Sequence, residues 1–415
     1  MVTVSTVLIM MGQGVISPVL PLLKDKFGVS SAEIALTLTS FGLARLVLNV
    51  PMGIAADRYG RRFLLVSGPF IAALGMLGSG FAADLPSLVA WRFVAGAGSA
   101  IYATGAQIYL ADISTPQTRA TFLGTNQSAL LLGTSMGPAN GGYAAETWGL
   151  AAPFVIVGLA SLIASAYAWW RLPETRAIAL ATADRERAER VAAGTGSADT
   201  PRFAWLRLLG SRGFILIAIT NIGIFFTRTG GRQTIMPLFG AQIGLSTSAL
   251  GGIFTMMALV NMVLVVPASA LADRYGRRWT IVPSGIAVGL SLFWMAGASS
   301  YTMFFAAAFV HALSTSLSAS APVAYAVDIA PPGMRGITLG LYRSAGDLGF
   351  MVGPPILGAI ADHSGFGAAL IANGVFMIVA SATFLLAREA TQHHSAPARS
   401  SAEAPEPGDT APATR

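Results

Sequence analysis

The hexapeptide Asp-Arg-Tyr-Gly-Arg-Arg occurs twice, at residues 57–62 and again at 273–278, and each copy directly follows a long apolar stretch. The two copies lie 216 residues apart. The same spacing relates Gly28 to Gly244, Ser30 to Ser246, Pro51 to Pro267, Asp112 to Asp328, Gly133 to Gly349, Gly137 to Gly353 and Pro138 to Pro354. A register kept over this length indicates that the chain is a duplicated unit.

The composition shows what kind of unit is duplicated. Only 11% of the residues are charged and 54% are hydrophobic, whereas soluble domains have about 25% charged residues. Apolar runs of about 20 residues, the length that crosses a bilayer, predict an all-α membrane protein with twelve transmembrane helices in two pseudo-symmetric six-helix bundles. The predicted spans are 2–22, 33–56, 63–83, 86–110, 120–144, 150–170, 213–236, 248–270, 279–299, 303–327, 336–360 and 366–387.

These spans divide the chain into four parts. We expect an N-terminal bundle at 1–171, a cytoplasmic linker at 172–212, a C-terminal bundle at 213–390 and a disordered cytoplasmic tail at 391–415. The opening span has no basic segment before it and no small-residue cleavage site, so we expect a retained helix rather than a signal peptide. Because that span also lacks a cytoplasmic leader, we expect the natural chain to begin upstream of Met1.

The basic residues are unevenly distributed between the two sides of the membrane. Of the 26 Lys and Arg residues, Lys24 and Lys26 are the two in predicted outer segments, five lie within spans, and all others fall on the opposite side. This is the positive-inside pattern, so we expect a plasma-membrane protein with both termini cytoplasmic rather than a nucleic-acid binder. The chain has no cysteine, and its four histidines show no ligand spacing, so we expect no metal and no cofactor. We expect a monomer.

The repeated loop and the residues before it read GIAADRYGRR. They resemble the signature loop after helix 2 in the major facilitator superfamily. The matching residues are Gly53, Asp57, Arg58, Gly60, Arg61 and Arg62 in the first copy and Asp273, Arg274, Gly276, Arg277 and Arg278 in the second, where Ser269 replaces the first glycine. The resemblance implies a gate, in which the aspartate faces the N-terminus of helix 11 in the outward-facing state and gains about 0.3 to 1 kcal/mol from the helix dipole. We expect the loop arginines to pair with Asp112 and, in the second half, with Asp328; a purely topogenic basic loop is the alternative.

The predicted helix 4 contains RFVAGAGSA, in which Arg92, Gly96, Gly98 and Ala100 match a second pattern of the superfamily. The position equivalent to Arg92 in the other half is Ala308. Residues repeated in both halves serve folding or gating, whereas an unrepeated charge within a span indicates a role with substrate or protons, because it costs about 2.5 to 3.5 kcal/mol to insert. Snorkelling toward the outer surface is the alternative for Arg92.

The predicted helix 5 reads GTNQSALLLGTSMGPANGG and resembles the pattern of drug:proton antiporters in the same superfamily. The matching residues are Gly124, Gly133, Gly137, Pro138, Gly141 and Gly142. Small residues every four positions let helices approach closely, so generic packing is the alternative. Part of the pattern recurs in helix 11, which favours that structural reading.

Five arginines lie within predicted spans: Arg45, Arg92, Arg228, Arg232 and Arg343. Asp347 is the one comparably deep carboxylate, and it is four residues from Arg343, so the two share a face of helix 11 and can pair. We expect Asp347 to be the coupling proton site, with Arg92 and Arg343 influencing its protonation. A permanent Arg343–Asp347 ion pair is the alternative.

The surplus of positive charge argues against a cationic substrate and favours a neutral or anionic one. The residues expected to line a cavity are Arg45, Gln107, Asn126, Gln127, Asn221, Arg228, Arg232 and His311. For the polar side chains the alternative is packing. For Arg232 it is snorkelling, and for Arg45 it is a structural pair.

The sequence contains no phosphate loop, metal cluster or nucleophilic triad in a plausible context, which argues against an enzyme. A membrane sensor would carry a signalling domain, for which the linker and tail are too short. We therefore expect a secondary active transporter for proton-coupled efflux (antiport) of small amphipathic compounds by alternating access. The alternative is proton-coupled uptake or exchange of a small organic anion. The expected partners are a small-molecule substrate, protons and the lipid bilayer.

Overall fold

The computed structural model describes residues 2–114, 118–177, 208–317, 321–330 and 335–387. Most of the expected linker and the whole of the expected tail lie outside these residues. The first bundle contains α1 (Val2–Gly14), η1 (Ser17–Val19), α2 (Leu20–Phe27), α3 (Ser31–Tyr59), α4 (Arg61–Gly80), α5 (Leu85–Asp112), α6 (Arg119–Trp148) and α7 (Ala152–Arg171). The second contains α10 (Arg212–Phe226), the π-helical η2 (Thr227–Ile235), α11 (Met236–Gln242), α12 (Thr247–Tyr275), α13 (Arg277–Ala296), α14 (Tyr301–Leu317), α15 (Ala321–Asp328), α16 (Arg335–Ser364), α17 (Phe366–Thr383) and η3 (Phe384–Leu386).

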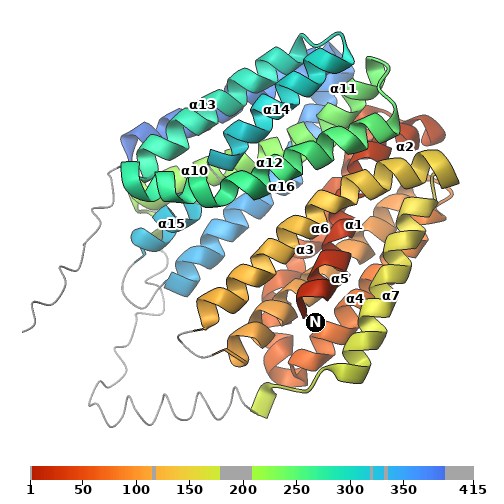
Figure 1. Cartoon of the computed structure of the whole chain (residues 1–415), viewed down its shortest axis with the longest axis vertical. Coiled ribbons are helices and arrows are strands. Elements are labelled where there is room, and N and C mark those ends of the chain that lie inside the picture. The colour runs from red at the N-terminus through yellow and green to blue at the C-terminus, as the bar shows by residue number, and fades with distance from the viewer. Residues whose placement is uncertain (1, 115–117, 178–207, 318–320, 331–334, 388–415) are drawn as a thin grey trace, which may run out of the picture.

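The helices form two bundles that lie side by side (Figure 1). Ten helical segments of the described chain are long and apolar enough to cross a membrane. The helices α5 and α6 complete the twelve; α5 contains Arg92, and α6 is rich in Gly, Ser, Thr and Asn residues. The predicted fold of twelve helices in two bundles is therefore confirmed. Each bundle has an apolar core, around Phe41 and Phe154 in the first half and around Phe254 and Phe304 in the second.

The duplication extends to the backbone conformation. Every residue with a positive φ in the described chain is a glycine, because a Cβ disfavours this conformation. They form three pairs 216 residues apart: Gly28 (63°) with Gly244 (86°), Gly60 (93°) with Gly276 (94°), and Gly149 (90°) with Gly365 (88°). Gly60 and Gly276 lie at the end of the molecule that carries the repeated loops, which we call the basic end. The other four lie at the opposite end.

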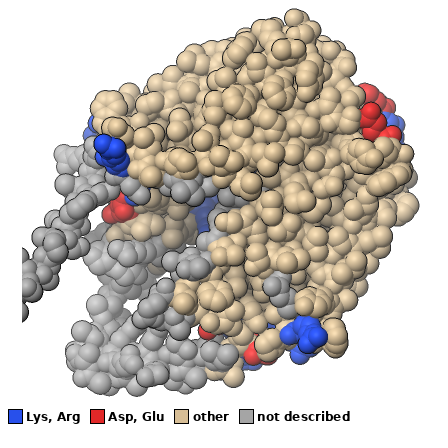
Figure 2. All heavy atoms as spheres, in the orientation of Figure 1, with Lys and Arg blue, Asp and Glu red and all other residues tan. Residues whose placement is uncertain are grey.

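The two halves meet along two helix pairs, α3 with α16 and α6 with α12. Small residues make these contacts close: a Cβ on Gly358 of α16 would lie 2.7 Å from the Cα of Ala32 in α3. Phe350 of α16 joins the core of the first half. At the left of Figure 2, toward the basic end, the surface between the halves is hollowed, and Lys or Arg atoms are visible inside the hollow.

Candidate transport cavity and gates

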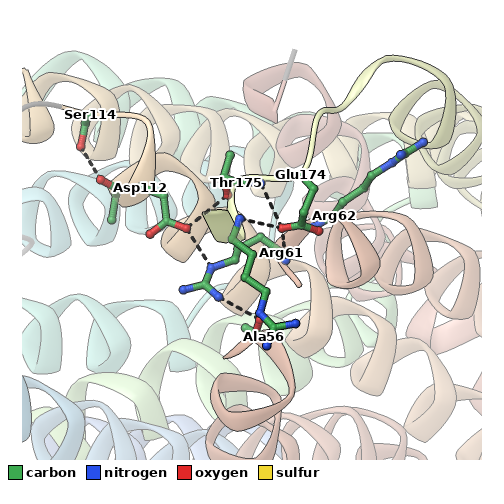
Figure 3. Close-up of polar contacts among 9 residues, drawn as sticks. Ala56, Arg61, Arg62, Asp112, Ser114, Glu174 and Thr175 are labelled. Carbon is green, nitrogen blue, oxygen red and sulfur yellow. Dashed lines mark hydrogen bonds and ion pairs between the residues drawn. The ribbon is translucent and has the colours of Figure 1, made fainter. Parts of the chain in front are cut away.

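The first repeated loop is organised by Arg61, the first residue of α4 (Figure 3). Its Nε donates to Oδ2 of Asp112, at the end of α5, at 2.8 Å, and its Nη1 donates to the carbonyl oxygen of Ala56 at 3.0 Å. Both side chains of the ion pair are largely buried. The loop therefore joins the ends of α3, α4 and α5 within one half.

Glu174, just after α7, caps the first turn of α4. Its carboxylate accepts hydrogen bonds from the backbone N–H groups of Arg61 at 2.9 Å and Arg62 at 3.1 Å (Figure 3). Burial raises the pKa of Glu174, but hydrogen bonds from four backbone amides outweigh it and hold the pKa below its ordinary value. Sequence reasoning missed this residue because it lies 113 positions after Arg61 along the chain, outside the motif.

The second loop repeats part of this arrangement. Nε of Arg277 lies 3.6 Å from Oδ2 of Asp328, and this pair is more exposed than the first. Arg58 and Arg274 each lie over the ring of the tyrosine that follows, at 5.5 and 5.6 Å. The side chains of Asp57 and Asp273 lie outside what the structure describes, so the contact of Asp57 with the N-terminus of α16, the eleventh transmembrane helix, stays a prediction.

Arg92 lies inside the first bundle and does not snorkel to the surface. Its side chain is 1% exposed. The guanidinium lies 4.8 Å from the ring centroid of Phe41 in α3, and its Nη1 lies 3.7 Å from the sulfur of Met76 in α4. Its Nε has no hydrogen-bond partner among the described residues. A buried guanidinium without a carboxylate partner is costly, which indicates a functional reason for keeping it.

The glycine pattern of helix 5 lies on α6 and faces two neighbours. A Cβ on Gly133 or Gly137 would collide with the carbonyl oxygen of Val7 or Met11 in α1, and one on Gly141 with that of Val15, just after α1. A Cβ on Gly142 would instead collide with the carbonyl oxygen of Thr247, across the interface in α12. The pattern thus allows close packing within the half and between the halves. The surroundings of Gly124 lie outside what the structure describes.

Three arginines lie within their helices, and two of them, Arg45 and Arg228, are close to each other across the interface between the halves. Arg45 in α3 is within electrostatic range of Arg228 in η2, and Arg228 is within range of Arg232. Nε of Arg45 is buried without a hydrogen-bond partner, and Arg228 lies over the ring of Phe225 at 5.8 Å. No hydrogen bond or ion pair to an acceptor in the described chain is formed by these three guanidinium groups. They are therefore available to a ligand.

Among the described residues, Asp347 of α16 is the carboxylate that interacts with Arg45. It interacts electrostatically with Arg45 and then with Arg343, and its Oδ2 accepts a hydrogen bond from Asn49 of α3 at 3.5 Å. The Arg343–Asp347 ion pair considered from the sequence is replaced by another contact: Nη1 of Arg343 donates to Oε1 of Gln107 in α5 at 3.0 Å. Sharing a helix face allows a pair, but here a neighbouring helix offers Arg343 an acceptor.

The other candidates hold helices together within one half. Asn126 accepts from Thr6 at 2.7 Å, Asn221 donates to the carbonyl oxygen of Tyr342 at 2.7 Å, and Nδ1 of His311 lies 2.9 Å from Oγ of Ser291. His311 is also within electrostatic range of Arg232. The side chain of Gln127 lies outside the description. The remaining candidates are linked by contacts that cross the interface, from Arg343 to Gln107 and from Arg45 to Arg228 and Asp347, while Arg232 lies beside Arg228 within the second half.

Sequence reasoning missed the π-helix η2, which positions Arg228 and Arg232. It spans Thr227–Ile235 and contains Gly230 and Gly231. A Cβ on Gly230 would lie 2.6 Å from the backbone of Gly353 in α16, so this segment packs closely against α16. Such π-helical segments within helices are frequent at functional sites. Among the described residues, no group of three or more His, Asp or Glu could hold a metal ion.

Comparison with known families agrees with this architecture. The chain matches the profile described as Major Facilitator Superfamily over residues 2–230 and again over 223–411. The chain belongs to the major facilitator superfamily. It is therefore a membrane transporter that carries a small molecule, not an enzyme. A solved structure of a bacterial homologue of the human lysosomal transporter Spinster, in an inward-facing and occupied conformation, has the same fold, with a TM-score of 0.75 at 18% identity; 93% of this chain and 95% of that one are covered.

The names of three relatives differ in what they say of a substrate. An uncharacterised MFS-type transporter of Methanocaldococcus jannaschii is 24% identical over 91% of this chain and 94% of its own length. A putative tartrate transporter of Agrobacterium vitis is 25% identical and covers 88% of this chain and 84% of its own. Multidrug resistance protein 1 of Bacillus subtilis is 27% identical, but over only 33% of this chain and 35% of its own.

Proposed function

We propose that this protein is a proton-coupled secondary transporter of a small organic anion, working by alternating access in the plasma membrane. The hollow at the basic end and the close contacts at the opposite end support an inward-facing conformation. By the positive-inside rule the basic end is cytoplasmic, which puts both termini in the cytoplasm. The two halves then rock about a site at the middle of the membrane.

The guanidinium groups of Arg45, Arg228 and Arg232 are the observation that supports an anionic substrate. Arg228 interacts unfavourably with Arg45 across the interface and with Arg232 on its own helix, and among the described residues Asp347 is a carboxylate that offsets the charge of Arg45. An anionic ligand lowers the cost of holding these charges together, whereas a cation raises it. Planar guanidinium groups also bind carboxylates through two parallel hydrogen bonds.

Asp347 is the proposed proton site. Because Arg45 faces both the cavity and Asp347, an anion that draws Arg45 away leaves the carboxylate without its main counter-charge and favours protonation. Proton and anion then bind together. Arg92, buried against α3, is proposed to influence this protonation step through its contact with Phe41. The loop residues Asp57 and Asp273 are proposed to gate the cytoplasmic side.

A second candidate function is proton-driven export of small amphipathic compounds. The glycine pattern on α6 favours it, since that pattern resembles drug:proton antiporters and packs α6 against both α1 and α12. The partial match to a multidrug resistance protein adds support over a third of the chain. The arginine cluster does not favour this function for cationic drugs.

Transport by purified protein in liposomes separates the two. With tartrate as the first probe and other small carboxylates beside it, we expect uptake stimulated by an inward proton gradient. Arg228→Gln should lower the uptake by about tenfold or more, because one charged contact is worth about 1.5 to 3 kcal/mol. Arg212→Gln, on the same helix but exposed at its end, should leave uptake unchanged.

The same liposomes, loaded with ethidium as an amphipathic cationic probe, test the second candidate. Proton-driven movement of ethidium that Arg228→Gln leaves intact, together with no carboxylate transport, would overturn the anion proposal in favour of export.

A further inference from the structure

Two carboxylates accept hydrogen bonds across the interface between the halves, at the end opposite the basic end. Asp362, near the end of α16, accepts hydrogen bonds from the backbone N–H groups of Ser31 and Ala32, the first two residues of α3, both at 2.8 Å. Glu146, near the end of α6, accepts one from the backbone N–H of Ser248, in the first turn of α12, also at 2.8 Å. Each carboxylate therefore holds the start of a helix that belongs to the other half.

The two contacts are equivalent under the internal repeat. Glu146 and Asp362 are 216 residues apart, and so are Ala32 and Ser248. The first half thus reaches into the second at one side of the interface, and the second half reaches into the first at the other side. The repeat had not drawn attention to these residues because the two carboxylates differ in type.

Each helix start leaves amides free for a carboxylate from outside. In α3, Ser30 and Glu33 cap each other, since Oγ of Ser30 accepts from the N–H of Glu33 and the N–H of Ser30 donates to Oε2 of Glu33. In α12, Oγ of Ser246 accepts from the N–H of Ala249. These local caps do not satisfy the N–H groups of Ser31, Ala32 and Ser248, which need another acceptor or water.

We propose that Glu146 and Asp362 are a pair of latches that hold the cavity closed on its outer side, and that both release when the transporter opens outward. The inference rests on the proposed alternating access. Their negative charges lie at the positive ends of the α3 and α12 dipoles, so the attraction is lost when the halves separate and water replaces the carboxylates. Placing one latch on each side of the interface resists opening along both helix pairs.

Glu146→Gln and Asp362→Asn keep the size of each side chain and remove its charge. We expect each to raise the ratio of outward-open to inward-open molecules about fivefold, and the double variant to raise it about 25-fold, since distant independent sites add in free energy. Asp362→Asn should have the somewhat larger effect, because Asp362 accepts hydrogen bonds from two backbone amides and Glu146 from one.

The chain has no cysteine, so spin labels can be placed without background. Labels at Phe81→Cys and Tyr301→Cys, exposed residues of different halves at the outer end, report the opening as a distance distribution in nanodiscs. The matched control is Asp84→Asn: this carboxylate caps α5 from within its own half, accepting from the N–H of Ser87 at 2.9 Å. It should leave the distances as in the wild type.

Glu146→Asp provides a second test, since it keeps the charge but shortens the reach, and it should also lengthen the distance between the labels. Unchanged distances in the double variant, with protein that is still monodisperse and folded, would overturn the proposal. An equal shift in Asp84→Asn would do so too, because it would make the effect a general loss of outer-face charge. The measurement needs no substrate, so a failure of the anion proposal would leave this result intact.

Discussion

The two halves of the transporter share a backbone but differ in their buried charges. The positive-φ glycines form pairs across the repeat, and so do the ion pairs of Arg61 and Arg277. The mid-membrane charges do not. At the equivalent positions of the other half, each of these charged residues has an uncharged counterpart: Arg45 corresponds to Asn261, Arg92 to Ala308, Arg228 to Gly12, Arg232 to Ile16, and Asp347 to Leu131.

This difference separates two kinds of requirement. Loops, turns and latches must act in the same way in both halves, because each half moves against the other. The transported molecule, by contrast, occupies a single site and is not symmetric, so the charges that meet it need not be repeated. A buried charge that lacks a counterpart is therefore best explained by what passes through the protein.

The most direct test of this interpretation is to remove the charge of Arg92, which has no counterpart in the second half. Arg92→Met keeps most of the side chain volume and removes a buried, unpaired guanidinium. We expect stability in detergent to stay level or rise by about 1 kcal/mol, since apolar replacement of buried charge is often stabilising. Gradient-driven transport should fall about 5- to 150-fold, the usual range of coupling between two sites.

Ala308→Met, at the equivalent position of the other half, is the control for altered packing. Its small side chain is buried, so overpacking should cost stability, about 1 to 3 kcal/mol, with coupling kept in the molecules that fold. Full coupling in Arg92→Met, or a loss of stability larger than that of the control, would make Arg92 part of the scaffold.

The repeated ion pairs allow a second comparison, between a tight and a loose copy of one contact. Arg61 and Asp112 are 2.8 Å apart with side chains 9% and 13% exposed, whereas Arg277 and Asp328 are 3.6 Å apart and 17% and 36% exposed. We expect Arg61→Gln to lower the free energy of unfolding by about 2 to 3 kcal/mol, and Arg277→Gln by less than about 1 kcal/mol.

Thermal unfolding in detergent at low and high salt checks this prediction. The effect of Arg277→Gln should shrink further at high salt, because exposed charges are screened, while that of Arg61→Gln should persist. Equal effects in the two variants would show that the loops contribute equally despite their different geometry.

These contacts also show what a sequence can and cannot predict here. The loop arginines and the aspartates Asp112 and Asp328 fall at the same ends of predicted spans, so an ion pair in each half could be expected from the sequence, although the choice of Arg61 and Arg277 could not. The latch of Asp362 on Ser31 joins residues 331 positions apart through backbone N–H groups, which have no signature in side chains. For Arg343 the helical spacing indicated Asp347, but Gln107 on another helix is the partner, because spacing on one helix carries no information about its neighbours.

The smallest expected effect concerns Glu174, a cap present in the described part of the first half and outside the repeated motif. Glu174→Gln should lower stability at pH 7 by less than about 1 kcal/mol, the usual size of an exposed helix cap. Because the folded-state pKa of Glu174 is lowered, its stabilising effect is present above the unfolded value of 4.5 and is lost as the pH falls through the folded pKa.

Unfolding of the wild type and Glu174→Gln, compared from pH 7 down to about pH 3.5, therefore tests whether the charge or the hydrogen bonds hold α4. We expect the two stability curves to converge on acidification, since the protonated carboxyl resembles the amide. Thr175→Val is the matched control: it removes a neutral hydroxyl that donates to Asp112 at 3.2 Å, so its difference from the wild type should not follow the titration of Glu174. A constant difference in stability between the wild type and Glu174→Gln over this pH range would show that the cap acts through neutral hydrogen bonding. The Arg61–Asp112 pair would then be the charged contact that stabilises the first loop.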